Sequence, residues 1–438
     1  MSWLQIVRLG LVQAAIGAVV VLLTTTVNRV IVVELGMPAS IPGLLVALHF
    51  GVQLALRPRL GHGSDVAGAR TPWIVGGMAV CALAGVGVAA SVPIMREQPV
   101  AGVALAALAS MVLGAGVSAS GTPLLALMSE RSRPHQRAGA AAITWILMIV
   151  GIIMTAATSG ALLDPFSFGR LTAIAAGIGG VGLVITVLAT FGVERSLPHL
   201  QHTVASDAAS RSFREALRTV WGEPAARAFA GFILLAMLAY SAQDLILEPF
   251  AGLAFGMTPG ESTRLSGTHH GGVLVGMVVT ALLATRTGQL RQWAAAGCAA
   301  SAVTYILLVL TPALGDVRIF RVVVPMLGVA NGVFAIGAIG SMMALTGDRT
   351  DGRAGLRLGV FGAAQAVAYA VGTMAGAAGV DVARRVMDSP VRGYLAVFAV
   401  EAMLFAVAAV LALRSASAER ASGVLHQRGE MLGAVLQS

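Results

Sequence analysis

Long apolar segments recur along the whole chain, separated by short breaks that carry charges, glycine or proline. Each is near the ~20 residues that an α-helix needs to cross the hydrocarbon core of a bilayer. The segments lack the polar–apolar alternation of barrel strands, so helices, which satisfy backbone hydrogen bonds within each span, are expected. The pattern predicts an all-α membrane protein with twelve transmembrane helices, at 7–33, 38–56, 72–94, 100–128, 138–162, 170–193, 226–248, 264–284, 292–312, 320–346, 356–380 and 393–414.

Composition supports this class and adds an orientation. Of the 438 residues, 57% are hydrophobic and 11% are charged, against about 25% charged residues in soluble domains. All 29 basic residues are arginines, and twenty of them fall in segments on the same side as the N-terminus. The positive-inside rule then predicts that both termini are cytoplasmic. Arginines that face the membrane lipids on one side account for the net charge of +9, so no nucleic-acid partner is expected.

The longest polar stretch divides the chain into two halves. It predicts a six-helix bundle over 1–193, a cytoplasmic linker over 194–225, a second six-helix bundle over 226–414 and a cytoplasmic tail over 415–438. Within the linker, Phe213, Leu217 and Trp221 share one helical face opposite Arg214 and Arg218. A short amphipathic helix on the membrane surface fits that pattern.

The two halves also repeat each other. The pattern GM, eleven residues, HxG occurs twice with a displacement of 220 residues, at Gly36, Met37, His49 and Gly51 and again at Gly256, Met257, His269 and Gly271. Six spans followed by six spans in the same orientation indicate a parallel duplication, with the two halves related by an axis along the membrane normal.

A charged, glycine-containing loop joins the second and third spans. Gly61, Asp65, Gly68 and Arg70 form the pattern GxxxDxxGxR, which is similar to the signature loop of the major facilitator superfamily. We expect Asp65 to contact Arg70 or a helix N-terminus and to latch one rocking state. The alternative is a turn needed only for insertion and folding. Thr285 stands where Asp65 maps in the second half, so one latch is expected.

Ionisable residues also occur inside the predicted spans, where they usually face protein or water. Asn28, Arg29 and Glu34 lie near the outer end of the first span, and Asp244 and Glu248 near that of the seventh. We expect Arg29 to pair with Asp244 or Glu248 and so bridge the halves on the outer side. The alternative is that these groups extend to the membrane interface.

Histidines form a second set of candidates. His49 and His269 are related by the repeat, and His270 follows the second of them. A neutral imidazole can ligate a metal, including the magnesium of a chlorin, can carry protons, or can hold a helix contact through a hydrogen bond. These three roles stay open. Further polar residues are expected to form interhelical hydrogen bonds: Gln13, Gln53, Asn331, Gln365 and Glu401.

Several motifs of enzymes are absent from the sequence. It has no phosphate-binding loop, no GxSxG turn and no large extramembrane domain, which argues against an enzyme with its own active site. Its two cysteines lie singly in apolar segments, so neither a disulfide framework nor a resident metal ion is expected. Few charged groups line the predicted cavity, which favours a hydrophobic substrate.

Three stretches carry a closer resemblance. TTTVNRVIVVELGMPASIPGLLVALHF at 24–50, RPRLGHGSDVAGARTPWIVGGM at 57–78 and SAQDLILEPFAGLAFGMTPGESTRL at 241–265 resemble the PucC/LhaA family of photosynthetic bacteria, a branch of the major facilitator superfamily also called the bacteriochlorophyll delivery family. The resemblance implies a role in assembling light-harvesting complexes, with bacteriochlorophyll or a late precursor as cargo and antenna polypeptides as partners. It also implies a location in the bacterial inner, intracytoplasmic photosynthetic membrane.

Three functions follow from the sequence as alternatives. The first is an assembly factor that binds bacteriochlorophyll and delivers it to antenna polypeptides. The second is a proton-coupled exporter of an amphipathic small molecule, in which Asp244 or Glu248 carries the proton. The third is a pigment-free scaffold that organises antenna subunits through its lipid-facing surface.

Overall fold

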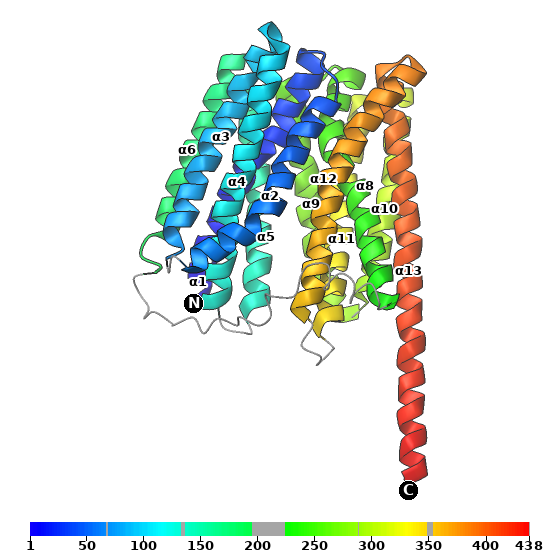
Figure 1. Cartoon of the computed structure of the whole chain (residues 1–438). Helices are drawn as coiled ribbons and strands as arrows, with labels where there is room; N and C mark the ends of the chain where they lie inside the picture. Colours follow the sequence, from blue (N-terminus) through cyan, green and yellow to red (C-terminus); the bar gives the residue numbers. More distant parts are fainter. Residues whose placement is uncertain (67–68, 133–135, 195–223, 288, 348–353, 438) are drawn as a thin grey trace.

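The computed structural model describes residues 1–66, 69–132, 136–194, 224–287, 289–347 and 354–437. Over these residues the chain forms long helices and no strand (Figure 1). The predicted amphipathic linker helix lies outside the described residues. The helices are α1 (Trp3–Leu22), continued by the π-helical turns η1 (Leu23–Val27) and η2 (Val30–Glu34), then α2 (Ser40–Val66), α3 (Thr71–Glu97), α4 (Pro99–Arg131), α5 (Arg137–Leu162), α6 (Phe168–Thr190), α8 (Pro224–Phe255), α9 (Pro259–Thr287), α10 (Leu290–Leu314), α11 (Val317–Gly347), α12 (Ala354–Met387) and α13 (Pro390–Gln437).

The helices form one layer of membrane-spanning length. Eleven of them have, within the described residues, the length and hydropathy needed to cross a bilayer. The other, α12, has 34 residues and runs beside α8 over the same height (Figure 1). The prediction of an all-α membrane protein is therefore confirmed. Helix α1 begins and α13 ends on the same side of this layer, which we call the termini side, and the opposite side is called the far side.

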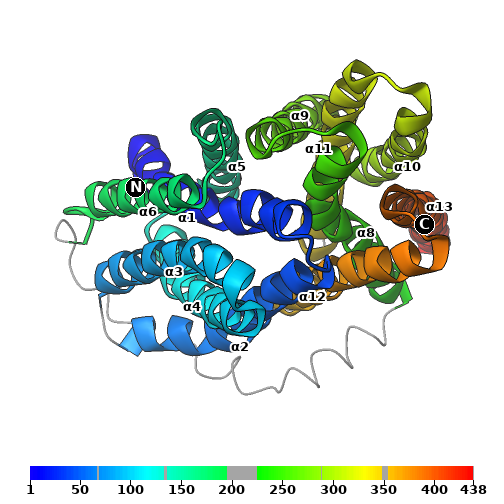
Figure 2. The same cartoon turned by 90° about the horizontal axis from the view of Figure 1, so that it is seen from above.

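Two bundles of six helices make up the molecule, α1–α6 and α8–α13 (Figure 2). The sequence repeat is visible in their packing, since α2 packs against α4 as α9 packs against α11. Gly114 of α4 lies directly against the carbonyl oxygen of His49, and Gly328 of α11 lies against that of His269. A glycine at each crossing allows the backbones to touch, which is how small residues promote helix packing in membranes.

The cores of the two bundles differ in side-chain size. Among the described side chains of the second half, seven phenylalanines and two tyrosines are fully buried and pack ring against ring, as Tyr305 does with Phe405 at 5.7 Å between centroids. The buried core of the first half consists of aliphatic side chains with methionine and cysteine. The second half therefore adds large interlocking rings to the close backbone crossings that both halves share.

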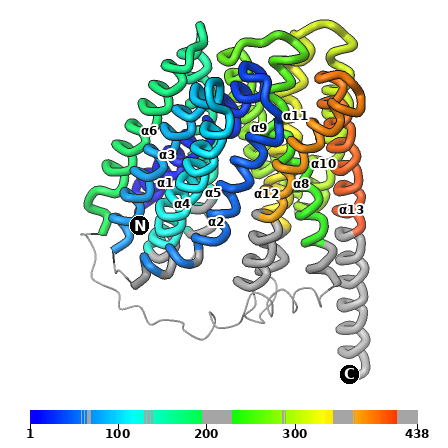
Figure 3. The backbone as a smooth tube through the Cα atoms, turned by 45° about the horizontal axis from the view of Figure 1, so that its top comes forward, coloured from blue at the N-terminus to red at the C-terminus, as the bar shows by residue number. Residues whose placement is uncertain are grey.

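Two helix pairs join the halves. Seen along the helices, α5 lies beside α9 and α2 beside α12 (Figure 2). Gly160 and Gly260 meet in the first pair, and Gly43 and Ala377 in the second, all toward the far side. The helices of the two halves diverge toward the termini side (Figures 1 and 3). The candidate residues of α1, α8 and α9 lie on this boundary.

Candidate functional site between the two halves

The stretch TTTVNRV lies where α1 changes from α-helical to π-helical hydrogen bonding. Single π-helical turns are rare overall, but where they occur they often lie at functional sites. Here the turns present three side chains to the second half. The Thr26 hydroxyl lies 3.2 Å from that of Thr263 on α9, and the Asn28 amide donates to the carbonyl oxygen of Leu245 on α8 at 2.6 Å. Arg29 makes the third contact.

Arg29 bridges the halves, but not as predicted. Its guanidinium pairs with Glu34 at 2.5 Å and also donates to the carbonyl oxygen of Met257 in the second half. The expected salt bridge with Asp244 or Glu248 does not form, although Glu248 lies near enough for the charge of Arg29 to act on it. Residues five apart lie on different faces of an α-helix, whereas the i to i+5 bonding of π-helical turns brings them over one another. The π-helical winding thus supplies Arg29 with an acid from its own helix.

Glu248 and Asp244 nevertheless both lie at the boundary. Glu248 is only 2% exposed and is surrounded by the hydroxyl groups of Thr25, Thr263 and Ser266, of which Thr263 donates to it at 3.4 Å. Asp244 lies one turn nearer the termini side and is partly exposed. These carboxyl groups therefore occupy a polar, hydroxyl-lined boundary without a salt bridge between them and Arg29.

Aromatic rings from both halves lie next to Asp244. Phe50 of α2 and Tyr369 of α12 have ring centroids 5.4 Å apart, and Tyr369 and Tyr240 of α8 are 6.0 Å apart. All three rings are partly exposed. This cluster gives the boundary an aromatic, apolar surface beside a carboxyl group, a combination that suits an amphipathic ligand.

His49 and His269 are both engaged by glutamines. The Gln53 amide lies 2.7 Å from Nε2 of His49, and the Gln243 amide lies 2.7 Å from Nε2 of His269. Both imidazoles are almost fully buried. An amide N–H that donates to Nε2 uses the lone pair that a metal would need. In this arrangement both histidines serve helix contacts and are poorly placed to ligate a pigment.

His270 differs from the other two. Its Nδ1 lies 2.9 Å from the carbonyl oxygen of Ser266, so the ring proton belongs on Nδ1 and the lone pair on Nε2. The ring is partly exposed, and no residue of the described part of the chain hydrogen-bonds to Nε2. His270 lies one helical turn after Ser266 and two turns after Thr263, so it is on the face of α9 that meets Glu248. A histidine whose Nδ1–H is held by a backbone carbonyl is in the usual state for ligating a metal through Nε2.

The signature loop is only partly described. Gly61 lies within α2, the Asp65 side chain and Gly68 lie outside the described residues, and the latch through Asp65 stays a prediction. Arg70 is buried and donates to the Ser64 hydroxyl at 2.9 Å. The backbone amides of Arg70 and Thr71 donate to the carboxylate of Glu194, at 2.7 and 3.1 Å.

Glu194 is a residue that the sequence analysis assigned to the linker and did not single out. A carboxylate at a helix N-terminus satisfies free amide groups and interacts favourably with the helix dipole. Here it connects the end of α6 to the start of α3, next to the signature loop. The sequence shows only that an acidic residue follows an apolar span. Which amides this residue binds depends on the tertiary structure.

Two further carboxylates join the halves on the far side. Asp381 of α12 accepts from the amides of Ala39 and Ser40 at the start of α2, at 2.9 and 2.8 Å. Asp164, after α5, pairs with Arg264 of α9 at 3.0 Å. Sequence reasoning missed both aspartates because they lie in ordinary positions near helix ends. They hold the far side of the boundary together.

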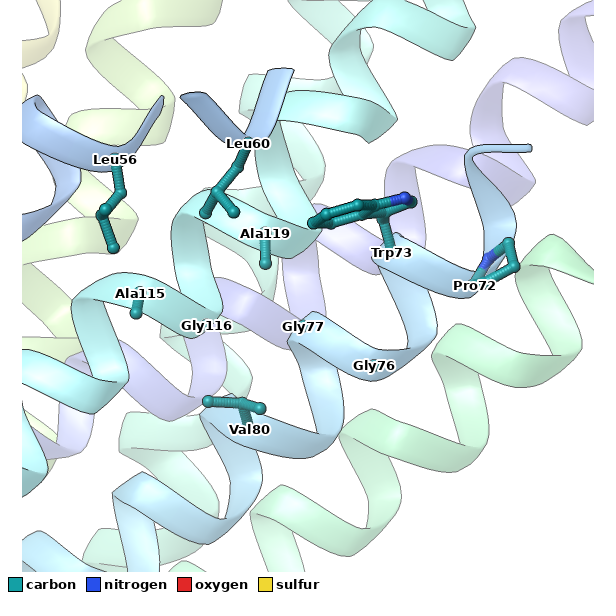
Figure 4. A pocket seen from close by; sticks show the side chains of 10 residues that line it. All are labelled: Leu56, Leu60, Pro72, Trp73, Gly76, Gly77, Val80, Ala115, Gly116 and Ala119. Carbon is teal, nitrogen blue, oxygen red and sulfur yellow. The ribbon is translucent and has the colours of Figure 1, made fainter. Parts of the chain in front are cut away.

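Two apolar hollows lie within the first half and not at this boundary. One, of about 450 Å³, lies between α2, α3 and α4, beneath the ring of Trp73 (Figure 4). The other, of about 620 Å³, is a groove between α1, α5 and α6, lined mainly by alanine, glycine and aliphatic side chains with Arg170 among them. Neither is lined by a histidine or a carboxylate, so they do not belong to the site described above.

Solved structures identify the fold. The chain superposes on a bacterial homologue of the human lysosomal transporter Spinster, in an inward-facing and unoccupied conformation, with a TM-score of 0.70 and 14% identity over 95% of this chain and 98% of that one. It also superposes on a mutant of the nucleoside transporter NupG, with a TM-score of 0.68 and 17% identity over 94% and 99% of the two chains. The protein has the major facilitator superfamily fold, with two six-helix halves.

Sequence comparison narrows the class to a family. A family model described as PUCC protein matches residues 26–419, and the chain belongs to this family. It is 46% identical to the bacteriochlorophyll synthase 44.5 kDa chain of Rhodobacter capsulatus, over 97% of this chain and 98% of that one. It is 29% identical to protein PucC of Cereibacter sphaeroides, over 95% and 93%. The resemblance found in the sequence is confirmed.

Proposed function

We propose that the chain is a carrier and assembly factor that binds bacteriochlorophyll between its two halves and delivers it to light-harvesting antenna polypeptides. It acts in the photosynthetic inner membrane of a bacterium, with both termini cytoplasmic. Support comes from the family, from the transporter fold and from a 46% identical relative whose name contains bacteriochlorophyll. The cargo could equally be a late precursor with the same macrocycle.

His270 is the observation that carries this proposal. Among the three histidines considered as pigment ligands, it alone has an Nε2 without a hydrogen-bond partner in the described part of the chain, and its Nδ1 is held by the Ser266 carbonyl. Its Nε2 would ligate the magnesium of the macrocycle. The partly exposed rings of Phe50, Tyr240 and Tyr369 supply apolar surface for it from the same boundary.

The protein in this proposal performs no chemistry on its cargo. The boundary offers carboxyl, hydroxyl, imidazole and phenol groups, and the sequence has no phosphate-binding loop and no GxSxG turn. The word synthase in the name of the R. capsulatus relative is therefore not carried over as an activity. Delivery is instead a change of contacts as the two halves rock about the boundary.

Absorbance of the purified protein tests the proposal. Wild type, His270→Ala and His269→Ala proteins are produced in a host that makes bacteriochlorophyll and are purified in mild detergent. We expect the wild type to retain pigment in near-stoichiometric amounts and His270→Ala to lose at least about 90% of it, since each 1.4 kcal/mol of lost binding is tenfold in affinity. His269→Ala, matched in position, should retain pigment if it folds. Equal retention by His270→Ala and the wild type, at equal thermal stability, would rule out this ligand.

A proton-coupled exporter is the second candidate, and the hydroxyl-lined carboxyl group of Glu248 favours it. In proteoliposomes with an imposed pH gradient, uptake of an amphipathic dye that is lost in Glu248→Gln would support export. Antenna polypeptides that co-purify with colourless protein would instead favour the pigment-free scaffold, for which the lipid-facing groove between α1, α5 and α6 offers a surface.

A further inference from the structure

A chain of hydrogen-bonded side chains runs through the core of the second half, away from the boundary. The Tyr305 hydroxyl on α10 donates to Oε1 of Gln243 on α8 at 2.5 Å, and the Gln243 amide nitrogen lies 2.7 Å from Nε2 of His269 on α9. Asn331 on α11 donates to the same Oε1 at 3.0 Å and accepts from Ser301 at 2.9 Å. The chain therefore links four helices through groups that are all deeply buried.

The directions of the hydrogen bonds in this structure follow from the placement of the Gln243 amide. Oε1 of Gln243 accepts twice, so its NH2 group must face His269 and donate to an unprotonated Nε2. The hydroxyl of Tyr305 has a single proton, which it gives to Gln243. The phenolic oxygen of Tyr305 can then only accept from any further neighbour.

That further neighbour is Glu401 of α13. Its side chain is 1% exposed and lies on the face of α13 whose Phe398 and Phe405 pack against the Tyr305 ring. Neither carboxyl oxygen has a conventional hydrogen-bond partner in the described structure. The titratable groups that act on it electrostatically are Tyr305 from α10 and, at longer range, Asp244 from α8, and the described residues of α12, which also packs on α13, add none. No described cation compensates a charge at this position.

An ionised carboxylate in this setting would be a buried, uncompensated charge at bilayer depth, which is costly. A neutral carboxylic acid resolves the arrangement, because its O–H group can donate to the one acceptor that Tyr305 still offers. We propose that Glu401 is a proton-binding site whose proton is coupled, through Tyr305 and Gln243, to the imidazole of His269.

The coupling follows from the balance of protons. When Glu401 releases its proton to water, the Tyr305 hydroxyl turns to donate to the carboxylate. The Gln243 amide then turns over, so that its NH2 donates to the Tyr305 oxygen and its Oε1 accepts from His269. His269 remains neutral, but its single proton moves from Nδ1 to Nε2. The Asn331 amide turns with Gln243, and its NH2 donates to Ser301. The Ser301 hydroxyl, which loses Asn331 as its acceptor, then donates to the carbonyl oxygen one turn earlier in its own helix, as serines in helices can do.

The change at His269 would affect His270 at the boundary, because the two rings are neighbours with centroids 5.3 Å apart. This last step rests on the proposed function, in which His270 holds the cargo. The proton site itself does not, since it is defined by groups in the core of the second half. The two ideas can therefore fail separately.

Infrared spectroscopy of the pigment-free protein in detergent tests the site. We expect the wild type at neutral pH to show the carbonyl stretch of a buried, protonated carboxylic acid, and Glu401→Gln to lose one such band. Glu97→Gln, which changes an exposed carboxylate at the end of α3, is the matched control and should leave the band intact. The same band in wild type and Glu401→Gln would show that Glu401 is ionised and would overturn the proposal.

A second measurement separates the relay from a merely structural network. Nitrogen NMR of protein labelled at histidine reports which ring nitrogen of His269 carries the proton, with His269→Gln used to assign the signal. In wild type and in Glu401→Gln, whose amide can donate to Tyr305 as the acid does, Nε2 should be unprotonated. Raising the pH until the carboxylic acid band disappears should move the proton to Nε2 in the wild type and not in Glu401→Gln. An unchanged His269 signal over that transition would exclude the coupling.

Discussion

Arg29 illustrates how much a single side chain contributes at the boundary. Its side chain is 3% exposed, yet its guanidinium satisfies an acid on its own helix and a carbonyl on the other half. Arginine suits this position because its planar group presents several donors in fixed directions, whereas lysine offers a compact point charge. The residue therefore acts as a joint between the halves, through geometry as well as charge.

Replacing Arg29 should measure that contribution. Arg29→Ala is expected to cost about 2 kcal/mol, the range for hydrogen bonds to charged groups, and to lower the midpoint of thermal unfolding in detergent. Arg29→Lys should fall between it and the wild type, because an ammonium reaches only one of the two acceptors well. Arg318→Ala, an exposed arginine on the far side, is the control and should leave the midpoint unchanged. An equally stable Arg29→Ala protein would mean that the two contacts contribute little.

At the scale of the element, backbone crossings and π-helical turns position the site. His49 and His269 lie where α2 crosses α4 and where α9 crosses α11, and a glycine faces each carbonyl oxygen. The π-helical turns of α1 re-aim Asn28 and Arg29 across the boundary. The two crossings are set by how closely the helix backbones approach.

The crossing of α9 and α11 can be tested by adding one methyl group. Gly328→Ala should displace α11 from the His269 backbone and cost about 1–3 kcal/mol through overpacking, despite the better helix propensity of alanine. Gly180→Ala, at an exposed position of α6 with open space around it, should be neutral or slightly stabilising. Thermal unfolding of the purified variants measures both. Similar midpoints for the two substitutions would indicate that α11 adjusts without strain.

At the scale of the whole molecule, the far side is held by contacts between the halves. Asp381 of α12 caps the start of α2, and Asp164 pairs with Arg264 across the α5–α9 contact. The helices diverge toward the termini side (Figure 3). In the proposed function, this arrangement is one state of a protein whose halves rock about a central boundary.

Loss of the Asp381 cap should loosen the far side. A cysteine introduced by Ala39→Cys replaces a side chain that is 2% exposed, and the native Cys81 and Cys298 are buried. We expect a water-soluble maleimide to label this variant slowly, and at least about tenfold faster when Asp381→Ala is added, since a loss of about 1.4 kcal/mol changes an opening equilibrium tenfold. Glu97→Ala, on the same side, should leave the rate unchanged. Equal labelling with and without Asp381 would show that other contacts hold this side closed.

The sequence by itself determined the spans, the two halves and the family. Apolar segments of membrane length can only become helices in a bilayer, because no water is present to satisfy a free backbone. The 220-residue repeat relates His49 to His269 without any tertiary information, and the stretches around Asn28 and Asp244 identify the family. These features depend on local composition and on order along the chain, which a sequence records directly.

Tertiary structure alone decided which groups meet. Arg29 pairs with Glu34 and not with Asp244 because π-helical winding shifts the face on which a side chain projects. That winding cannot be predicted from an apolar stretch of sequence. Glu194 and Asp381 became helix caps because a distant helix ends within reach of each carboxylate. His270 differs from His269 because its Nε2 has no hydrogen-bond partner among the described residues, whereas Nε2 of His269 has one. Such choices depend on distances of a few ångströms between residues far apart in the chain, and those distances exist only once the helices have packed.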